Sequence, residues 1–249
     1  MPVHRGRHCR VRGPGAGVRV RACGVGVVSQ ARASLWVPQC VDDWRALLNE
    51  PEVFVLANRA LNEVVAQIQP DQWDMELPAG FAVRGTDRVP TLREVINYHA
   101  YDDAWVPDMV AGRTMEEAGA AKFDGDLLGT DPAAAFAAIV EKACAAAERL
   151  GDTDLDAAVA HLSFGDYTVR QYFWQINMFR AMRAHDLALA IGVVPALPPA
   201  LVQGVWDEVT PNAEEWRSIG VFPAAVPVPD EASLLDRLLC LTGRQPSGA

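Results

Sequence analysis

The stretch TLREVINYHAYDDAWVPDMVAG, residues 91–112, decides the fold of this chain. Its apolar residues recur every three or four positions and so form one stripe along a helix. Thr91 followed by Glu94 is a capping box, which begins a helix by satisfying its first backbone N–H groups. Gly112 is typical of the position just past a helix end. The stretch therefore predicts one long helix that buries a single face.

Two polar side chains interrupt this apolar stripe. His99 and Asp103 follow Leu92 at spacings that return both of them to the face that Leu92 begins, and Asp102 adjoins them. A histidine and a carboxylate on a core-facing side are costly to bury unless they are paired or bind a metal ion. A lone histidine in such a place is more often a hydrogen-bonded core residue than a metal ligand, and both interpretations stay open.

The stretch TVRQYFWQINMFRAMRAHDLALAI, residues 168–191, predicts a second long helix that begins at a capping box of Thr168 and Gln171. One face of this helix carries an apolar stripe, and continuing its helical spacing leads to Arg183 and, one turn later, to Asp186. A cation therefore stands where an apolar residue is expected, unless Arg183 is a surface residue whose stem packs on apolar neighbours. The apolar stripe runs through Val169, Tyr172, Phe173, Ile176 and Phe179.

The rest of the chain is also dominated by helical periodicity. A loop rich in Pro and Gly occupies residues 70–90, and residues 158–168 predict a short extended piece. We therefore expect an all-α fold, a four-helix bundle with extra C-terminal helices, in which sites are built from side chains that face the core. The further helices are predicted at 52–68, 132–150, 199–219 and 231–242.

Charge divides the chain into two parts. Residues 1–40 contain seven Arg and no Asp or Glu, whereas the whole chain carries −10, so residues 41–249 carry −17. Such a negative body repels phosphate backbones, which argues against nucleic-acid binding by the folded part. We expect residues 1–40 to be a disordered, basic, Arg- and Gly-rich extension and residues 41–249 to be the helical bundle domain.

Cysteine use and hydropathy point to the compartment. The five cysteines show neither C-x-x-C nor paired Cys/His spacing, which is typical of unpaired thiols in a reducing cytoplasm. The sequence has no run of about 18 apolar residues, so it predicts no transmembrane helix and no membrane partner. We therefore expect a cytoplasmic protein.

Three separated segments resemble one known family. They are REVINYHAYDDAWVPDMVAG, YFWQINMFRAMRAHDLALAIG and VFPAAVPVPDEASLLDRLLCLTGR, in this order. Over residues 53–244 the chain resembles the DinB/YfiT-like superfamily, in particular the proteins grouped with mycothiol-dependent maleylpyruvate isomerase. The resemblance implies a four-helix bundle that holds a divalent metal, often zinc or nickel. It also implies a chemistry in which the metal activates a low-molecular-weight thiol such as mycothiol for isomerisation or S-transfer.

The metal ligands that the resemblance implies are mostly replaced in this chain. The family has one His on the second helix and a Glu-x-x-x-His pair on the fourth, followed by Asp-Leu-Ala. His99 matches the first ligand and Asp186 begins the Asp-Leu-Ala, but the second His falls on Arg183 and the Glu falls on Phe179. Neither replacement can donate a lone pair at neutral pH, and one imidazole cannot hold zinc, which needs about three protein ligands.

The preferred interpretation is a degenerate metal site. We expect Arg183 to replace the charge of the metal and to pair with Asp103 or Asp186 near His99. Such a pair can anchor a carboxylate-bearing small molecule, and His99 could act as a general acid or base, its pKa raised toward neutral pH by the acidic neighbour. A set of His99, Asp103 and Asp186 that binds a harder metal is the alternative.

Three functions remain open from the sequence. The first is a metal- and thiol-dependent isomerase or transferase with rearranged ligands. The second, which we favour, is a divergent member of the family that binds or acts on a small acidic molecule without the metal. The third is a non-catalytic helical protein that works through assembly, with a homodimer as the expected form.

Overall fold

Helix α1 (Glu50–Val65) begins at a complete capping box that was not predicted. The side chain of Asn49 accepts a hydrogen bond from the backbone N–H of Glu52 at 2.9 Å, and the Glu52 carboxylate accepts one from the N–H of Asn49 at 2.8 Å. The helix therefore begins two residues before the predicted position. Pro51 lies in the first turn, where its missing N–H would have had no partner within the helix.

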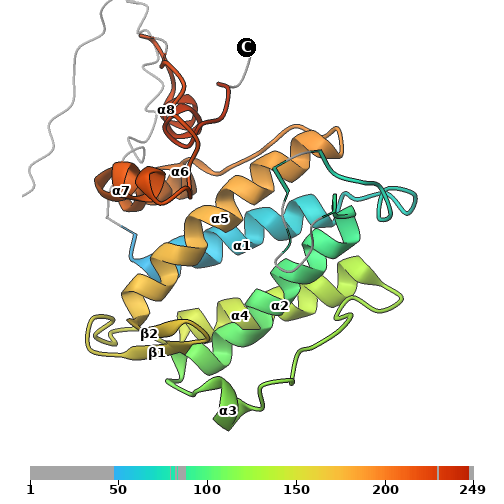
Figure 1. Cartoon of the computed structure of the whole chain (residues 1–249), viewed down its shortest axis with the longest axis vertical. Coiled ribbons are helices and arrows are strands. Elements are labelled where there is room, and N and C mark those ends of the chain that lie inside the picture. The colour runs from blue at the N-terminus through green and yellow to red at the C-terminus, as the bar shows by residue number, and fades with distance from the viewer. Residues whose placement is uncertain (1–47, 79, 82, 84–87, 229, 247–249) are drawn as a thin grey trace, which may run out of the picture. The chain divides into compact units, whose positions relative to one another are not determined.

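Helices dominate the computed structural model (Figure 1), which describes residues 48–78, 80–81, 83, 88–228 and 230–246. The prediction of an all-α fold is confirmed, whereas the expected extension at 1–40 lies outside the described residues. In the described part, no helix is long and apolar enough to cross a membrane. The remaining helices are α2 (Leu92–Val110), α3 (Met115–Ala118), α4 (Pro132–Glu148), α5 (Val169–Ala190), α6 (Pro199–Val209), η2 (Thr210–Asn212), α7 (Ala213–Ser218) and α8 (Leu234–Leu241).

The predicted elements differ from the structure mainly near the C-terminal end. Both predicted capping boxes, at α2 and at α5, are present. The helix predicted at 199–219 is divided by the 3-10 turn η2, because Pro211 has no N–H to continue the ladder of α6. The extended piece predicted at 158–168 is a hairpin, in which β1 (Val159–Leu162) pairs antiparallel with β2 (Gly165–Thr168).

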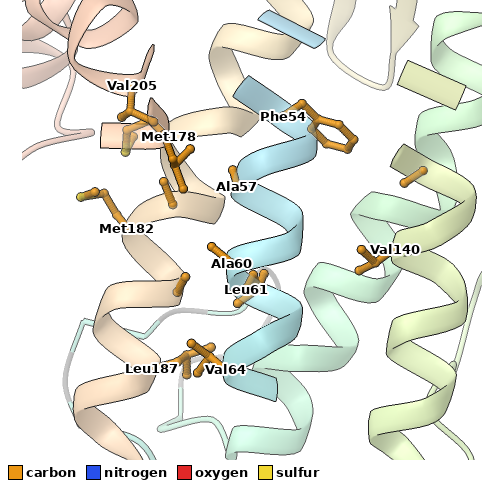
Figure 2. Close-up of a cluster of buried hydrophobic side chains, with 14 of the residues drawn as sticks. Phe54, Ala57, Ala60, Leu61, Val64, Val140, Met178, Met182, Leu187 and Val205 are labelled. Atoms are coloured by element: carbon orange, nitrogen blue, oxygen red, sulfur yellow. The ribbon is translucent and has the colours of Figure 1, made fainter. Parts of the chain in front are cut away.

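Helix α1 lies at the centre of the packing. It contacts α5 on one side and α4 on the other, and α4 also packs against α2. Figure 2 shows the small side chains of Ala57 and Ala60 on the side of α1 that faces α5, and Val64 of α1 beside Leu187 of α5. Further along, the rings of Phe54 and Phe173 lie with their centroids 5.2 Å apart. These side chains are buried, so α1 and α5 are held together by an apolar seam.

A buried amide ties α6 to this seam. The Asn177 side chain on α5 donates hydrogen bonds to the carbonyl of Glu50 at 2.9 Å and to the carboxyl of Glu208 at 2.8 Å. Helix α6 approaches α1 so closely that a Cβ on Gly204 would lie 2.6 Å from a methyl group of Val53. Burial raises the pKa of the Glu208 carboxyl to about 8. The hydrogen bond from Asn177 opposes this rise, and the nearby charge of Glu50 adds to it.

The raised pKa predicts a pH-dependent effect of Glu208→Gln on stability. Above about pH 4.5 the unfolded chain releases the Glu208 proton, whereas the folded chain keeps it until about pH 8. The wild type therefore loses stability over this interval, and the variant, which keeps an acceptor for Asn177, does not. We expect Glu208→Gln to have little effect at pH 4.5 and to raise the free energy of unfolding by about 1–3 kcal/mol at pH 9.

Urea denaturation at the two pH values measures this difference. Asp207→Asn is the matched control, because Asp207 neighbours Glu208 on α6 but is exposed. An equal effect of Glu208→Gln at pH 4.5 and pH 9 would contradict the prediction.

Candidate functional site

Four polar side chains from three helices lie in the interior. Asn58 comes from α1, His99 and Asp103 come from α2, and Arg180 comes from α5. None of them is more than 4% exposed. We call these four residues the polar core. The prediction that His99 and Asp103 face the interior is confirmed, whereas Asn58 and Arg180 were not predicted to belong to a site.

The polar core is built around one carboxylate oxygen. Arg180 donates a hydrogen bond from Nε to Oδ1 of Asp103 at 2.7 Å and a second one from its terminal nitrogen to the same oxygen. Asn58 also donates to Oδ1, at 3.3 Å, while Oδ2 of Asp103 has no partner. Burial alone would lower the pKa of Arg180, but the charges of Asp103 and Asp102 outweigh it and raise that pKa. The guanidinium therefore stays charged in the interior.

This arrangement corrects the predicted pairing of Arg183. The cation that pairs with Asp103 is Arg180, and no ion pair of Arg183 occurs in the described part of the chain. The predicted stripe on α5 followed the apolar residue Phe179, which is 46% exposed. The face that is buried instead continues from Phe173 through Asn177 to Arg180, at the helical spacing of four and three residues.

Arg183 lies at the edge of the polar core, and no described residue forms an ion pair with it. Its guanidinium is stacked over the ring of Phe81, 4.6 Å from the ring centroid. Burial lowers the pKa of Arg183, although the charge of Asp186 opposes this effect. Asp186 itself is bound by Arg244, which donates to its two carboxylate oxygens at 2.9 and 2.8 Å. The predicted pair of Arg183 with Asp186 is therefore also wrong.

His99 is buried with both ring nitrogens lacking a hydrogen-bond partner. Burial, followed by the charges of Arg183 and Arg180, lowers the pKa of His99 well below its ordinary value. The predicted rise of this pKa is therefore wrong, because burial disfavours the charged imidazole and the two cations act in the same direction. At neutral pH the imidazole is uncharged and offers one N–H donor and one acceptor, neither of which binds another residue in the described part of the chain.

Asp102 and Cys144 border the polar core. Burial raises the pKa of the Asp102 carboxyl to about 6, with Arg180 opposing this rise and Asp103 adding to it. Cys144 on α4 is buried and unpaired. Burial also raises the pKa of its thiol, to about 12, and the charge of Asp103 adds to the rise. Burial also raises the pKa of the Asp103 carboxyl, against its contacts with Arg180 and Asn58. The pKa of Asp102 therefore lies near neutral pH, while the Cys144 thiol keeps its proton.

The side chains around His99 do not fit the metal that the family resemblance implies. Among the residues that the structure describes, no group of three or more His, Cys, Asp or Glu side chains is placed to hold a metal ion. The alternative set of His99, Asp103 and Asp186 is not assembled, because each carboxylate is bound by an arginine. Zinc needs about three protein ligands, so this donor set does not support a family-type centre.

No protein-family model, no curated protein and no solved structure matches this chain. The resemblance to the DinB/YfiT-like proteins therefore rests on the sequence segments alone.

The buried ion pair predicts a large loss of stability in Arg180→Met. The substitution keeps an unbranched side chain but leaves the Asp103 carboxylate buried without its cation. Breaking a buried pair in this way typically costs about 3–5 kcal/mol of the free energy of unfolding, whereas replacing both partners with apolar residues is often neutral. We therefore expect Arg180→Met to lower the urea midpoint strongly and the double variant with Asp103→Leu to recover most of the loss.

Arg59→Met is the matched control. Arg59 forms an ion pair with Glu148 at 3.0 Å, but both side chains are more than half exposed. We expect this control to lose less than about 1 kcal/mol. Equal losses in Arg59→Met and Arg180→Met would contradict the account of the polar core.

Proposed function

We propose that this protein is a divergent relative of the DinB/YfiT-like proteins that binds a small carboxylate-bearing molecule where its relatives hold a metal. The observation that carries the proposal is Arg183, a half-buried guanidinium with no ion pair or side-chain hydrogen bond in the described part of the chain. We call Arg183, with Phe81 against it and His99 near it, the anion site.

The charges around the anion site favour an anionic ligand. Arg180 and Asp103 compensate each other, so their pair attracts little further charge. Arg183 forms no ion pair with any residue that the structure describes, and a cation shielded from water attracts an anion more strongly than an exposed one. A guanidinium also presents parallel N–H groups that match the two oxygens of a carboxylate. The ring of Phe81, 4.6 Å from the Arg183 guanidinium, adds a cation–π contact that favours the charged guanidinium at this position.

His99 supplies the second recognition group. Its unpaired N–H and its unpaired ring nitrogen can donate to and accept from a polar ligand group. Because its pKa is low, the uncharged imidazole first acts as a hydrogen-bonding group. A bound carboxylate would offset the charge of Arg183, which is the second cause of the low pKa of His99 after burial.

Ligand binding tests the proposal directly. Purified protein is titrated calorimetrically with acetate, succinate, maleate and mycothiol. We expect at least one carboxylate to bind to the wild type and Arg183→Met to weaken that binding by about ten- to a hundredfold, the value of a charged hydrogen-bonded contact. Arg59→Met should bind as the wild type does. Wild-type protein that binds none of the carboxylates would contradict the proposal and leave a non-catalytic helical protein as the better account.

Metal analysis distinguishes the main alternative. A metal- and thiol-dependent enzyme with rearranged ligands requires a resident ion, whereas the anion site does not. We expect purified protein to contain far less than one zinc or nickel ion per chain. One tightly bound ion per chain, lost in His99→Leu, would overturn the proposal in favour of the metal-dependent enzyme.

His99→Leu separates recognition from stability. Leucine removes two unpaired polar nitrogens from the interior, so we expect the melting temperature to stay the same or to rise. The carboxylate should nevertheless bind at least about fivefold more weakly, because a hydrogen-bonding group of the site is lost. A variant that is less stable but binds the carboxylate unchanged would indicate that His99 is a structural residue only.

A further inference from the structure

We infer that Arg244 is a positioning residue for the anion site: by holding both carboxylate oxygens of Asp186, it leaves Arg183 free to bind the ligand. The part of the inference that concerns ligand binding rests on the proposed function. Its structural part, the competition of two arginines for one carboxylate, can be tested without any ligand.

Asp186 is the natural partner of Arg183 within α5. The two residues are three positions apart on the helix, a spacing at which opposite charges lie close enough to pair. Their charges do influence each other, since Asp186 opposes the fall in the pKa of Arg183. A pair between them would cover the guanidinium and cancel its charge. The anion site therefore exists only while Asp186 is occupied elsewhere.

Arg244 occupies Asp186 completely. Its Nε donates to Oδ1 and its terminal nitrogen donates to Oδ2, which is the two-point geometry that a guanidinium and a carboxylate favour. The ring nitrogen Nδ1 of His185 lies 3.2 Å from Oδ1 as well. Although burial opposes them, these contacts lower the pKa of Asp186 to about 2, so the carboxylate is charged at every ordinary pH.

The end of α8 holds Arg244 in place. The backbone N–H of Arg244 donates to the carbonyl of Leu239 at 2.8 Å, and the buried hydroxyl of Thr242 donates to the carbonyl of Leu238 at 2.9 Å. Between them, Gly243 has a φ of +80°, and a Cβ there would lie 2.6 Å from the ring of Pro223. A residue with a side chain cannot replace Gly243 without strain. The backbone that leads from α8 to Arg244 therefore has one defined conformation, which directs Arg244 towards α5.

Two features keep Arg183 from pairing with Asp186. The guanidinium of Arg183 lies over the ring of Phe81, and among the described residues the ion-pair partner of Asp186 is Arg244 rather than Arg183. The charge of Arg244 lowers the pKa of Arg183, which shows that the two cations lie close enough to repel each other. Removing Arg244 takes away both the competitor and the repulsion. Asp186 then becomes free to turn to Arg183 and to compete with the ligand.

A double-mutant cycle tests the competition without a ligand. The urea midpoints of Arg183→Met, Asp186→Asn and their double variant give the coupling between the two residues, first with Arg244 present and then in an Arg244→Met background. We expect no favourable coupling with Arg244 present and a favourable one in its absence. Coupling that is the same in both backgrounds would overturn the inference, even if Arg244→Met is less stable, because each cycle is referred to its own background.

Maleate binding tests the consequence for the anion site. We expect Arg244→Met to weaken maleate binding by about three- to tenfold, the range of a competing partly exposed ion pair. The double variant Arg244→Met with Asp186→Asn should bind maleate nearly as well as the wild type, since the competitor is gone. If Arg244 acted only by stabilising the fold, the double variant would bind maleate as weakly as Arg244→Met does. That result would contradict the inference.

The two tests separate the possible failures. Wild-type protein that does not bind maleate or the other carboxylates contradicts the proposed function, whereas the cycle still decides whether Arg244 keeps Asp186 from Arg183. Wild-type protein that binds maleate, together with unchanged binding by Arg244→Met, contradicts the positioning role alone.

Discussion

The buried ion pair of Arg180 with Asp103 is the interaction around which the interior is arranged. It joins α5 to α2 through the space beside α1, and the hydrogen bond from Asn58 adds α1 to the same oxygen. The guanidinium also lies 5.3 Å from the ring centroid of Phe54. A pair like this adds little net stability, because both charges lose their water. It does define which faces of the three helices must meet.

The pair also sets the electrostatic character of the site. Arg180 is paired with a carboxylate in the interior, whereas Arg183 forms no ion pair with the residues that the structure describes. Burial lowers the pKa of the His99 imidazole, the two cations lower it further, and the ring therefore stays uncharged. The site therefore combines a fixed positive charge with a neutral group that can both donate and accept. This combination suits an anion with a neighbouring polar group better than it suits a cation or a metal ion.

The sequence predicts local structure well because helix signals are local. Capping boxes at Thr91 and Thr168 lie within four residues of each helix start, and both are present in the structure. The place of His99 and Asp103 on a buried face follows from the same short-range periodicity. The capping box of α1, at Asn49 and Glu52, was visible in the sequence by the same rule but was overlooked.

The partners within the site could not be predicted in this way. Arg180 and Asp103 are 77 residues apart, and Arg244 and Asp186 are 58 residues apart, so only the packing of the helices decides that they meet. The predicted stripe on α5 differs from the buried face because Phe179 is apolar but 46% exposed, whereas Arg180 is polar and buried. Continuing the helical spacing from Phe173 through Asn177 would have placed Arg180 inside, since a polar residue can lie on a buried face when its partner comes from another helix.

The buried thiol of Cys144 has a chemical consequence for this interior. Nucleophilic attack on a disulfide or an alkylating agent requires a thiolate, and a thiol with a pKa of about 12 is almost fully protonated at neutral pH. The side chain is also 2% exposed, so reagents cannot reach it in the folded protein. A sulfur nucleophile working beside His99 would thus have to be delivered by a bound molecule, and Cys144 would neither compete with it nor be consumed by it.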